Sequence, residues 1–379
     1  MEQHATNTVI IGAGPAGLAV GACLKRAGIS FEILEGAGQV GSAWRGHYQR
    51  LHLHTDKARS QLPFFPYPKD YPRYPSRLQV VQYLEDYARH WGLQPRFGQE
   101  VAAARRQDGL WLVQTRDGEY RGENLVVASG NTRQPFVPQW PGQDGFPGPL
   151  LHSAQYKDGE PFKGQRVLVV GFGNSGGEIA IDLCEHGARP DIAVRSPVNI
   201  IPRELFGLPI LAIALVASKL PAAVADGLTA PILRLLYGDL ERLGLRKKAY
   251  GPIAQIKRDG RIPLIDIGTV ALIKEGSVGV RPGVERFAGD QVHFSDGQHA
   301  AYDAVILATG YRPRLDGILP DDGEALDGQG APRSSGAEVA PGLFCCGFAV
   351  PPTGVLREIA KEAQAIAAAI QGKQGASAG

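Results

Sequence analysis

The chain has 379 residues, of which 44% are apolar and 21% charged, a composition typical of a globular α/β protein and not of a disordered one. Its 40 basic and 38 acidic residues give a formal net charge of +2, so there is no electrostatic reason to expect a nucleic-acid partner. The start of the chain lacks a signal-peptide pattern and no apolar run is long enough to span a membrane, so we expect a cytoplasmic protein with no integral membrane segment.

The first predicted unit begins with a β-branched strand at 8–11, continues through the turn GAGPAG and a helix, and ends a second strand on Glu35. In such a turn Gly12 allows a tight exit from the strand, and Gly14 lets a pyrophosphate approach the backbone. Gly17 lets the helix pack close to the sheet, and Glu35 is placed to accept hydrogen bonds from ribose hydroxyls. The unit predicts a dinucleotide site, because a structural glycine turn alone does not explain Glu35.

The next predicted elements are a helix and a hairpin. Residues 76–91 predict a helix, since Ser76 and Gln79 form a capping box at its start and Gly92 follows its end. The turn Asp117-Gly118 predicts a hairpin that leads into a strand ending at Gly130.

A second copy of the pattern follows about 159 residues after the first. A strand at 166–170 leads into the turn GFGNSG, a helix to about residue 186 and a strand at 191–194. A hairpin and a final strand, ending at Gly310, repeat the tail of the first copy. Because strand, helix and strand alternate in each copy, both should form parallel sheets.

The repeat predicts an α/β fold with two tandem Rossmann-like dinucleotide-binding domains in three layers, the second inserted in the first. We assign residues 1–158 and 311–379 to a discontinuous first domain and 159–310 to the second, with a helical insertion at about 205–245. The apolar stretch at 206–236 has three readings: a lid over a substrate channel, a packed helical core or dimer surface, or a membrane-surface contact.

The second copy has no carboxylate where Glu35 would map. Val194 and then Arg195 and Ser196 stand there, and an arginine beside a hydroxyl suits a 2′-phosphate that a carboxylate would repel. This favours NADPH over NADH, the alternative being that Arg195 is only a solvated loop charge. Two dinucleotides with different ribose readers imply hydride transfer between them, so the first copy should hold FAD.

The four cysteines form no CxxC or CxxxxC pair, so we expect buried thiols and no disulfide relay. No metal site is predicted. A further motif lies between the copies, with the pattern FxGxxxHxxxY carried by Phe146, Gly148, His152 and Tyr156.

This motif resembles the fingerprint of the class B flavin-containing monooxygenases, in which Baeyer–Villiger relatives usually end it in Trp. The segments GSAWR at 41–45, GFGNSGGE at 171–178 and VILATGYRP at 305–313 are similar to the YUCCA branch, the indole-3-pyruvate monooxygenases of auxin synthesis, and the likeness extends over about 90% of the chain. It implies that NADPH reduces FAD, that O₂ forms a C4a-peroxyflavin, and that a 2-oxo acid such as indole-3-pyruvate is oxidatively decarboxylated. Alternatives are a flavin monooxygenase of amines, sulfides or ketones, and an NADPH oxidase or reductase.

The glycine motifs and the resemblance together imply a set of site residues. His54 stands where the family has an active-site side chain, although a structural histidine is the alternative. Ser129 replaces a common Thr, and Phe348 replaces a common Asp. Predicted FAD contacts are Gly12, Gly14, Pro15, Ala16, Gly17, Glu35, Gly36, Trp44, Arg45, Leu62, Val101, Ala128, Ser129, Gly130, Gly347 and Phe348. Predicted NADPH contacts are Gly171, Gly173, Asn174, Ser175, Gly176, Arg195, Ser196, Ala308, Thr309 and Gly310. The expected partners are a small-molecule substrate and O₂, with a homodimer as a further possibility.

Overall fold

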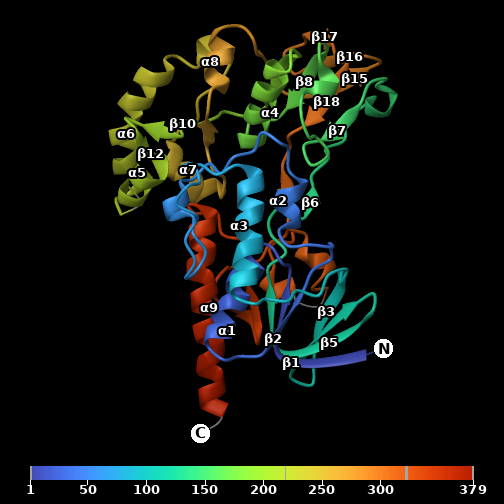
Figure 1. Ribbon diagram of the computed structural model, residues 1–379. Coiled ribbons are helices and arrows are strands. Elements are labelled where there is room, and N and C mark those ends of the chain that lie inside the picture. Colours follow the sequence, from blue (N-terminus) through green and yellow to red (C-terminus); the bar gives the residue numbers. More distant parts are fainter. Residues whose placement is uncertain (1, 218, 321–322, 378–379) are drawn as a thin grey trace.

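The computed structural model describes residues 2–217, 219–320 and 323–377. It contains two largely parallel sheets, one at each end of the molecule in Figure 1, each covered by helices. Each glycine turn joins a parallel strand to a helix, and the chain returns to the first sheet after it has completed the second. The predicted fold class, two tandem Rossmann-like domains with one inserted in the other, is therefore confirmed.

The first sheet has the strand order β2-β1-β5-β21-β20, and the hairpin β3-β4 continues it beside β5. β1, β2, β5 and β21 run parallel, with Thr8 opposite Phe31 and Leu343 opposite Leu125. Three helices bury apolar side chains on one face, while the hairpin and the segment 315–326 cover the other. The strands are β1 (Glu2–Ile11), β2 (Phe31–Leu34), β3 (Val101–Gln107), β4 (Leu110–Thr115), β5 (Gly118–Val127), β20 (Glu338–Ala340) and β21 (Leu343–Cys345), and the helices are α1 (Pro15–Arg26), α3 (Arg77–His90) and α9 (Val355–Ser377).

The start of α3 is fixed by a reciprocal pair of hydrogen bonds. The Ser76 hydroxyl accepts from the Gln79 amide at 3.3 Å, and the Gln79 side chain accepts from the Ser76 amide at 2.9 Å. Two donors that the first helical turn would leave unpaired are thereby satisfied. The predicted capping box is confirmed.

The second sheet is parallel throughout, with the order β14-β9-β8-β18-β7. Helices α4 and α8 pack on one face, and a separate antiparallel sheet of β15, β16 and β17 packs on the other. The strand β7 precedes the predicted domain boundary at 158, yet it belongs to this sheet. The bounds are β7 (Leu150–His152), β8 (Arg166–Val170), β9 (Arg189–Ala193), β14 (Gly279–Arg281), β15 (Val284–Ala288), β16 (Gln291–Phe294), β17 (His299–Ala301), β18 (Ala304–Leu307), α4 (Asn174–Glu185) and α8 (Thr269–Lys274).

The predicted insertion forms a helical group beside the second sheet (Figure 1). Its long apolar side chains are largely uncovered, with Phe206 84% and Leu235 86% exposed. None of the helices in the described ranges is long and apolar enough to cross a membrane. The elements are β10 (Ile200–Pro202), β11 (Glu204–Leu205), β12 (Leu208–Pro209), α5 (Ile210–Ala217), α6 (Ala222–Tyr237), α7 (Pro252–Asp259) and β13 (Leu264–Asp266).

Two connections run between the sheets. β6 (Gln134–Pro135) and β19 (Tyr311–Arg312) pair antiparallel where the chain leaves and re-enters the first half. The short helix α2 (Ser42–Gly46) leads into the segment 47–60, which lies against α4 of the second half. The two nucleotide motifs are therefore held together by chain from both halves.

Candidate cofactor and substrate site

The first glycine turn leaves its backbone open to a ligand. A Cβ at Gly12, where φ is +106°, would lie 2.7 Å from the carbonyl oxygen of Ala128. A Cβ at Gly17 would lie 1.8 Å from the carbonyl oxygen of Gly12, so only glycine allows α1 to approach the strand. At Gly14 nothing lies within 4 Å of a Cβ position, so the space beside the helix N-terminus is free for a phosphate.

The second glycine turn has the same close contacts at equivalent positions. Gly171 has φ +112°, and its Cβ would lie 2.5 Å from the carbonyl oxygen of Ala308. A Cβ at Gly176 would lie 2.0 Å from the carbonyl oxygen of Gly171, while nothing is near Gly173. The sequence repeat is thus a repeat of two phosphate-accepting backbone turns.

Glu35 ends β2 beside the first turn, and it is only 8% exposed. Its Oε2 accepts from the Ala13 amide at 2.7 Å, and its Oε1 accepts from the Ala37 amide at 2.9 Å and the Ser42 hydroxyl at 3.2 Å. These three donors fix the orientation of the carboxylate. Glu35 is therefore a fixed acceptor at the position where a dinucleotide places ribose hydroxyls.

The corresponding end of β9 carries an exposed basic side chain where β2 ends on a buried acidic one. Val194 is buried, whereas Arg195 and Ser196 are exposed. The carbonyl oxygen of Arg195 accepts from the guanidinium of Arg246 at 2.6 Å, so a second cation stands beside the first. The stem of Arg195 lies against Gly283, where an added Cβ would be 3.1 Å from Cγ. This end of the sheet suits a phosphate dianion and not a pair of hydroxyls.

One cavity of ≈ 780 Å³ lies in front of the first turn, within the range of about 300–1,000 Å³ usual for cofactor and substrate sites. Most of its wall comes from the first half, but Asn174, Ile262 and Ile265 come from the second. The predicted residues that line it are Gly12, Gly14, Pro15, Ala16, Glu35, Gly36, Trp44, Val101, Ala128, Ser129, Gly130, Gly347, His54 and Asn174.

Four predicted flavin residues do not line this cavity. Gly17 lies behind the turn, as its packing role requires. Arg45 donates to the carbonyl of Val40 at 3.0 Å and pairs with Glu85. Leu62 is buried, and its amide donates to the Tyr83 hydroxyl at 2.8 Å. The side chain of Phe348 packs in the core behind the sheet. In this structure these residues support the cavity wall.

The cavity wall contains one buried polar group that a bound dinucleotide would satisfy. The hydroxyl of Ser129 is buried and has no hydrogen-bond partner within the described residues, although the residue lines the cavity. An orphaned buried hydroxyl is costly unless a ligand satisfies it. Gly347 donates its amide to Glu362 at 2.7 Å, and Asn131 donates to the carbonyls of Gly347 and Phe348 at 3.3 and 3.2 Å. An acidic and an amide side chain thereby fix the segment in which Phe348 replaces the common Asp.

Three histidines line the cavity, and only one of them has a carboxylate partner. His52 donates Nδ1–H to the carbonyl of Arg50 at 2.7 Å. Burial, together with the charge of Lys157, lowers the pKa of His47. His54 pairs through Nε2 with Glu178 of α4. His54 is therefore the histidine that joins the cavity to the second nucleotide helix.

Residues of the FxGxxxHxxxY motif do not line the cavity but brace the second sheet. His152 donates Nε2–H to the carbonyl of Gly310 at 3.0 Å and accepts at Nδ1 from the Ala154 amide at 3.1 Å, so it is neutral. Tyr156 donates to Asp182 of α4 at 2.5 Å. A Cβ at Gly148 would lie 2.0 Å from the carbonyl of Asp303, and Phe146 packs on Phe287. The motif fixes β7 beside β18.

The remaining predicted residues of the second site lie around its turn. The side chain of Asn174 accepts from the Ile265 amide at 2.8 Å, which ties the turn to β13. The Thr309 hydroxyl donates to the carbonyl of Phe136 at 2.5 Å, and Gly310 has φ +88°. Ser175 lies beside the Tyr48 hydroxyl. Thr309 and Gly310 thus anchor the crossing between the halves.

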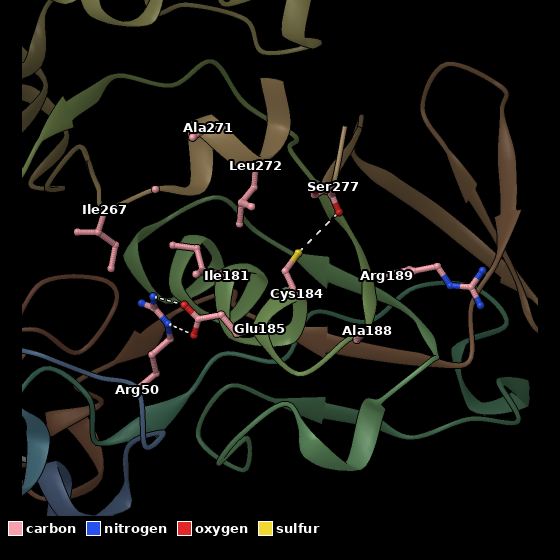
Figure 2. A pocket seen from close by; sticks show the side chains of 11 residues that line it. Arg50, Ile181, Cys184, Glu185, Ala188, Arg189, Ile267, Ala271, Leu272 and Ser277 are labelled. Atoms are coloured by element: carbon pink, nitrogen blue, oxygen red, sulfur yellow. Dashed lines mark hydrogen bonds and ion pairs between the residues drawn. The ribbon is translucent and has the colours of Figure 1, made fainter. Parts of the chain in front are cut away.

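A second cavity, of ≈ 620 Å³, lies between the C-terminal half of α4 and α8 (Figure 2). Figure 2 shows Arg50 joined to Glu185 by two hydrogen bonds, and the Cys184 thiol directed at the carbonyl of Ser277. Both hydrogen bonds between Arg50 and Glu185 are 2.8 Å long. Burial raises the pKa of this thiol to about 11, so it is not a ready nucleophile. All four cysteines are free, and none lines the flavin-side cavity. Within the described ranges no group of His, Cys, Asp or Glu could hold a metal ion.

Several cavity residues were not among the sequence predictions. Asn131 and Glu100 are polar, and Val355 and Leu356 bring the start of α9 to the wall. Glu178 does not line the cavity itself, but it pairs with the cavity residue His54. Asn131 follows the predicted Gly130 directly, and Glu178 lies two residues beyond Gly176, so both were within reach of the motifs. The contribution of α9 was not, because no local pattern places a C-terminal helix at a cavity more than 300 residues earlier in the chain.

Comparison with known proteins gives a consistent result. The sequence profile of the family described as pyridine nucleotide-disulphide oxidoreductase matches residues 9–200. Indole-3-pyruvate monooxygenase YUCCA8 of Oryza sativa subsp. indica is 40% identical over 359 residues, which cover 90% of this chain and 85% of that relative. Indole-3-pyruvate monooxygenase YUCCA1 of Oryza sativa subsp. japonica is 40% identical over 355 residues, covering 92% and 87%. The solved flavin-containing monooxygenase from Stenotrophomonas maltophilia is 24% identical, covers 98% of this chain and 99% of its own, and has a TM-score of 0.74, which shows the shared fold.

Proposed function

Because the chain belongs to the YUCCA family of class B flavin-containing monooxygenases, we propose that it uses NADPH and O₂ on a bound FAD to convert indole-3-pyruvate, or a similar 2-oxo acid, to the acid with one carbon fewer. In this reaction one oxygen atom enters the new carboxylate and the other leaves as water. NADPH supplies two electrons, and the original carboxylate leaves as CO₂.

The observation that supports this direction of electron flow is the contrast between the two repeated turns. Both turns leave a free backbone for a pyrophosphate, at Gly14 and at Gly173. Glu35 at the first is a buried acceptor, and Arg195 at the second is an exposed cation with Arg246 beside it. A flavin dinucleotide lacks the 2′-phosphate that NADPH carries, so the first turn suits FAD and the second suits NADPH.

The residues of this chain would act mainly by binding, orienting and excluding water. The α1 N-terminus, Glu35 and Ser129 would hold FAD, which supplies the two-electron chemistry with O₂ that no side chain provides. Gly173 and Arg195 would hold the reductant. His54 at the cavity wall carries the proton-exchanging group, and the apolar side chains of the wall keep bulk water from the reacting centre.

The family profile raises a second candidate, transfer of electrons to a disulfide. That reaction needs a redox-active thiol near the flavin. None of the four cysteines lines the cavity, and burial raises the pKa of Cys23 to about 12. The arrangement therefore favours O₂ over a disulfide as the electron acceptor.

The test is NADPH consumption by the FAD-loaded enzyme against a panel of 2-oxo acids, amines, sulfides and ketones, with product and peroxide measured together. We expect one product molecule per NADPH with indole-3-pyruvate or another aromatic 2-oxo acid. Coupled turnover on amines or sulfides alone would replace the substrate class. Stoichiometric peroxide with every compound would show an NADPH oxidase instead.

A further inference from the structure

Helix α4 carries a buried carboxylate at a position where the repeat predicts an apolar side chain. The two glycine turns are 159 residues apart, so Glu178 corresponds to Ala19 of α1, which is fully buried in the first core. Glu178 is only 2% exposed, and its Oε2 accepts no hydrogen bond within the described residues. Burying a carboxylate carries a large desolvation penalty unless a partner compensates it. The departure from the repeat therefore requires an explanation beyond packing.

The partner of Glu178 is a side chain of the flavin-side cavity. His54 belongs to the segment that follows α2, it lines the cavity, and its Nε2 pairs with Oε1 of Glu178. The imidazole side chain is 16% exposed. No hydrogen bond to its Nδ1 occurs among the described residues, so this nitrogen is available to a molecule in the cavity. The pair thus links the helix of the second nucleotide turn to the wall of the first site.

We propose that Glu178 is a positioning residue that orients His54 and stabilises its protonated form, so that Nδ1–H of His54 is the proton donor inside the cavity. This inference rests on the proposed function, since a donor is needed where O₂ is reduced. The carboxylate fixes the ring by accepting from Nε2–H, and its negative charge favours the imidazolium. Proton donation leaves a neutral imidazole, which takes its proton back from solvent.

The other charged groups around the pair have partners of their own, so Glu178 is the charged group that acts on His54 most directly. On the segment after α2, Arg50 pairs with Glu185, two turns farther along α4, and Lys157 acts on His47 from the connection beyond β7. Arg77 at the start of α3 donates to a backbone carbonyl. Each of these cations therefore has a hydrogen-bond partner other than His54.

Two further side chains face the pair from the same elements. The Tyr48 hydroxyl lies beside Glu178, and burial and then the charge of Glu178 raise its pKa far above neutrality, so it stays uncharged. Asp182, one turn along α4, accepts from Tyr156 and faces His186 instead. Among these groups, Glu178 is the anion in direct contact with His54.

The first arm of the test measures that pKa directly. In the FAD-loaded enzyme, the His54 ring signals are assigned by comparison with H54Q and titrated by NMR. If the carboxylate holds the proton on the ring, the midpoint of the His54 titration should fall in E178Q. E178D retains the charge and should give a value between the two. E185Q removes a carboxylate two turns farther along α4, where it pairs with Arg50, and it should change this pKa much less than E178Q does.

The second arm asks whether the proton matters to the chemistry. The rate of peroxide release with NADPH and O₂ and no organic substrate is measured against pH. If His54 is the donor, release falls as pH rises through its pKa, so the fall should occur at lower pH in E178Q by the same shift that NMR gives. A merely structural ion pair would change the melting temperature and leave this profile in place.

The outcomes are separable. An unchanged His54 pKa in E178Q overturns the positioning role, and a shifted pKa with an unshifted peroxide profile overturns the role as donor. Flavin content and circular dichroism check that E178Q folds, and E178D gives the same comparison if it does not. Neither arm uses an organic substrate, so failure of indole-3-pyruvate to react leaves both readouts intact.

Discussion

Gly14 and Gly173 offer the sharpest way to separate the two nucleotides, because the same small change acts at equivalent places in the repeat. Their backbone angles are φ −81°, ψ −172° and φ −102°, ψ −172°, which alanine adopts without strain. Nothing lies within 4 Å of either Cβ position. G14A and G173A should therefore fold. Alanine restricts the unfolded chain but is a poorer N-cap than glycine, so we expect little net change in stability without ligand.

The added methyl group would occupy the space through which a pyrophosphate reaches the backbone amides. Loss of one charge-assisted hydrogen bond costs about 1.5–3 kcal/mol, which corresponds to roughly 10- to 150-fold in affinity. G14A should lose FAD to this extent, measured by flavin absorbance and by titration of the deflavinated protein. G173A should keep its FAD and raise the KM for NADPH to a similar extent.

The control is the third glycine of each turn. A Cβ at Gly17 would lie 1.8 Å from a backbone oxygen, so G17A should destabilise the fold itself. If G14A retained stoichiometric FAD with unchanged affinity, or if G173A lost FAD and kept its KM for NADPH, the assignment of the two turns would be wrong.

Three further changes test other parts of the structure. R195A should lower kcat/KM for NADPH by about 10- to 100-fold and leave that for NADH nearly unchanged, since only the 2′-phosphate loses a partner; an equal loss for both nucleotides would contradict this role. Y156F should reduce the free energy of unfolding by about 1–3 kcal/mol, because buried Asp182 loses its donor, while the KM for NADPH stays the same; a raised KM with unchanged stability would place Tyr156 in the site instead. S76A should reduce the free energy of unfolding by about 1 kcal/mol in urea denaturation, and no measurable change would mean that the capping box does not stabilise α3.

The parts of this molecule that the sequence predicts correctly are those that depend on residues close together in the chain. The strand, glycine turn and helix of each copy follow from spacing, and the steric contacts of Gly12 and Gly171 show why only glycine serves there. The capping box of α3 is equally local. Arg45 and Phe348 were assigned to flavin contact by likeness, whereas their side chains lie in an ion pair and in the core.

Contacts between residues far apart in the chain could not be predicted from local sequence patterns. His54 and Glu178 are 124 residues apart, and neither has a local pattern that names its partner. β7 joins the second sheet although it precedes the glycine turn of that half, because its partner β18 lies about 150 residues later. The second hairpin separates from its sheet between β17 and β18, whereas β5 is one continuous strand in the first copy. Spacing alone could not distinguish these cases.

The differences between the two copies nevertheless carry information that an alignment of the chain with itself would have revealed. Where α1 has Ala19 and Cys23 on its core face, α4 has Glu178 and Asp182, four residues apart and therefore on one face. The apolar face of α1 packs against α9, whereas the acidic face of α4 meets the histidine and tyrosines of the crossing segments. A helix that packs only in a core has no need of this face. In the second copy this face of α4 therefore holds His54 at the flavin-side cavity, where the first copy completes an apolar core.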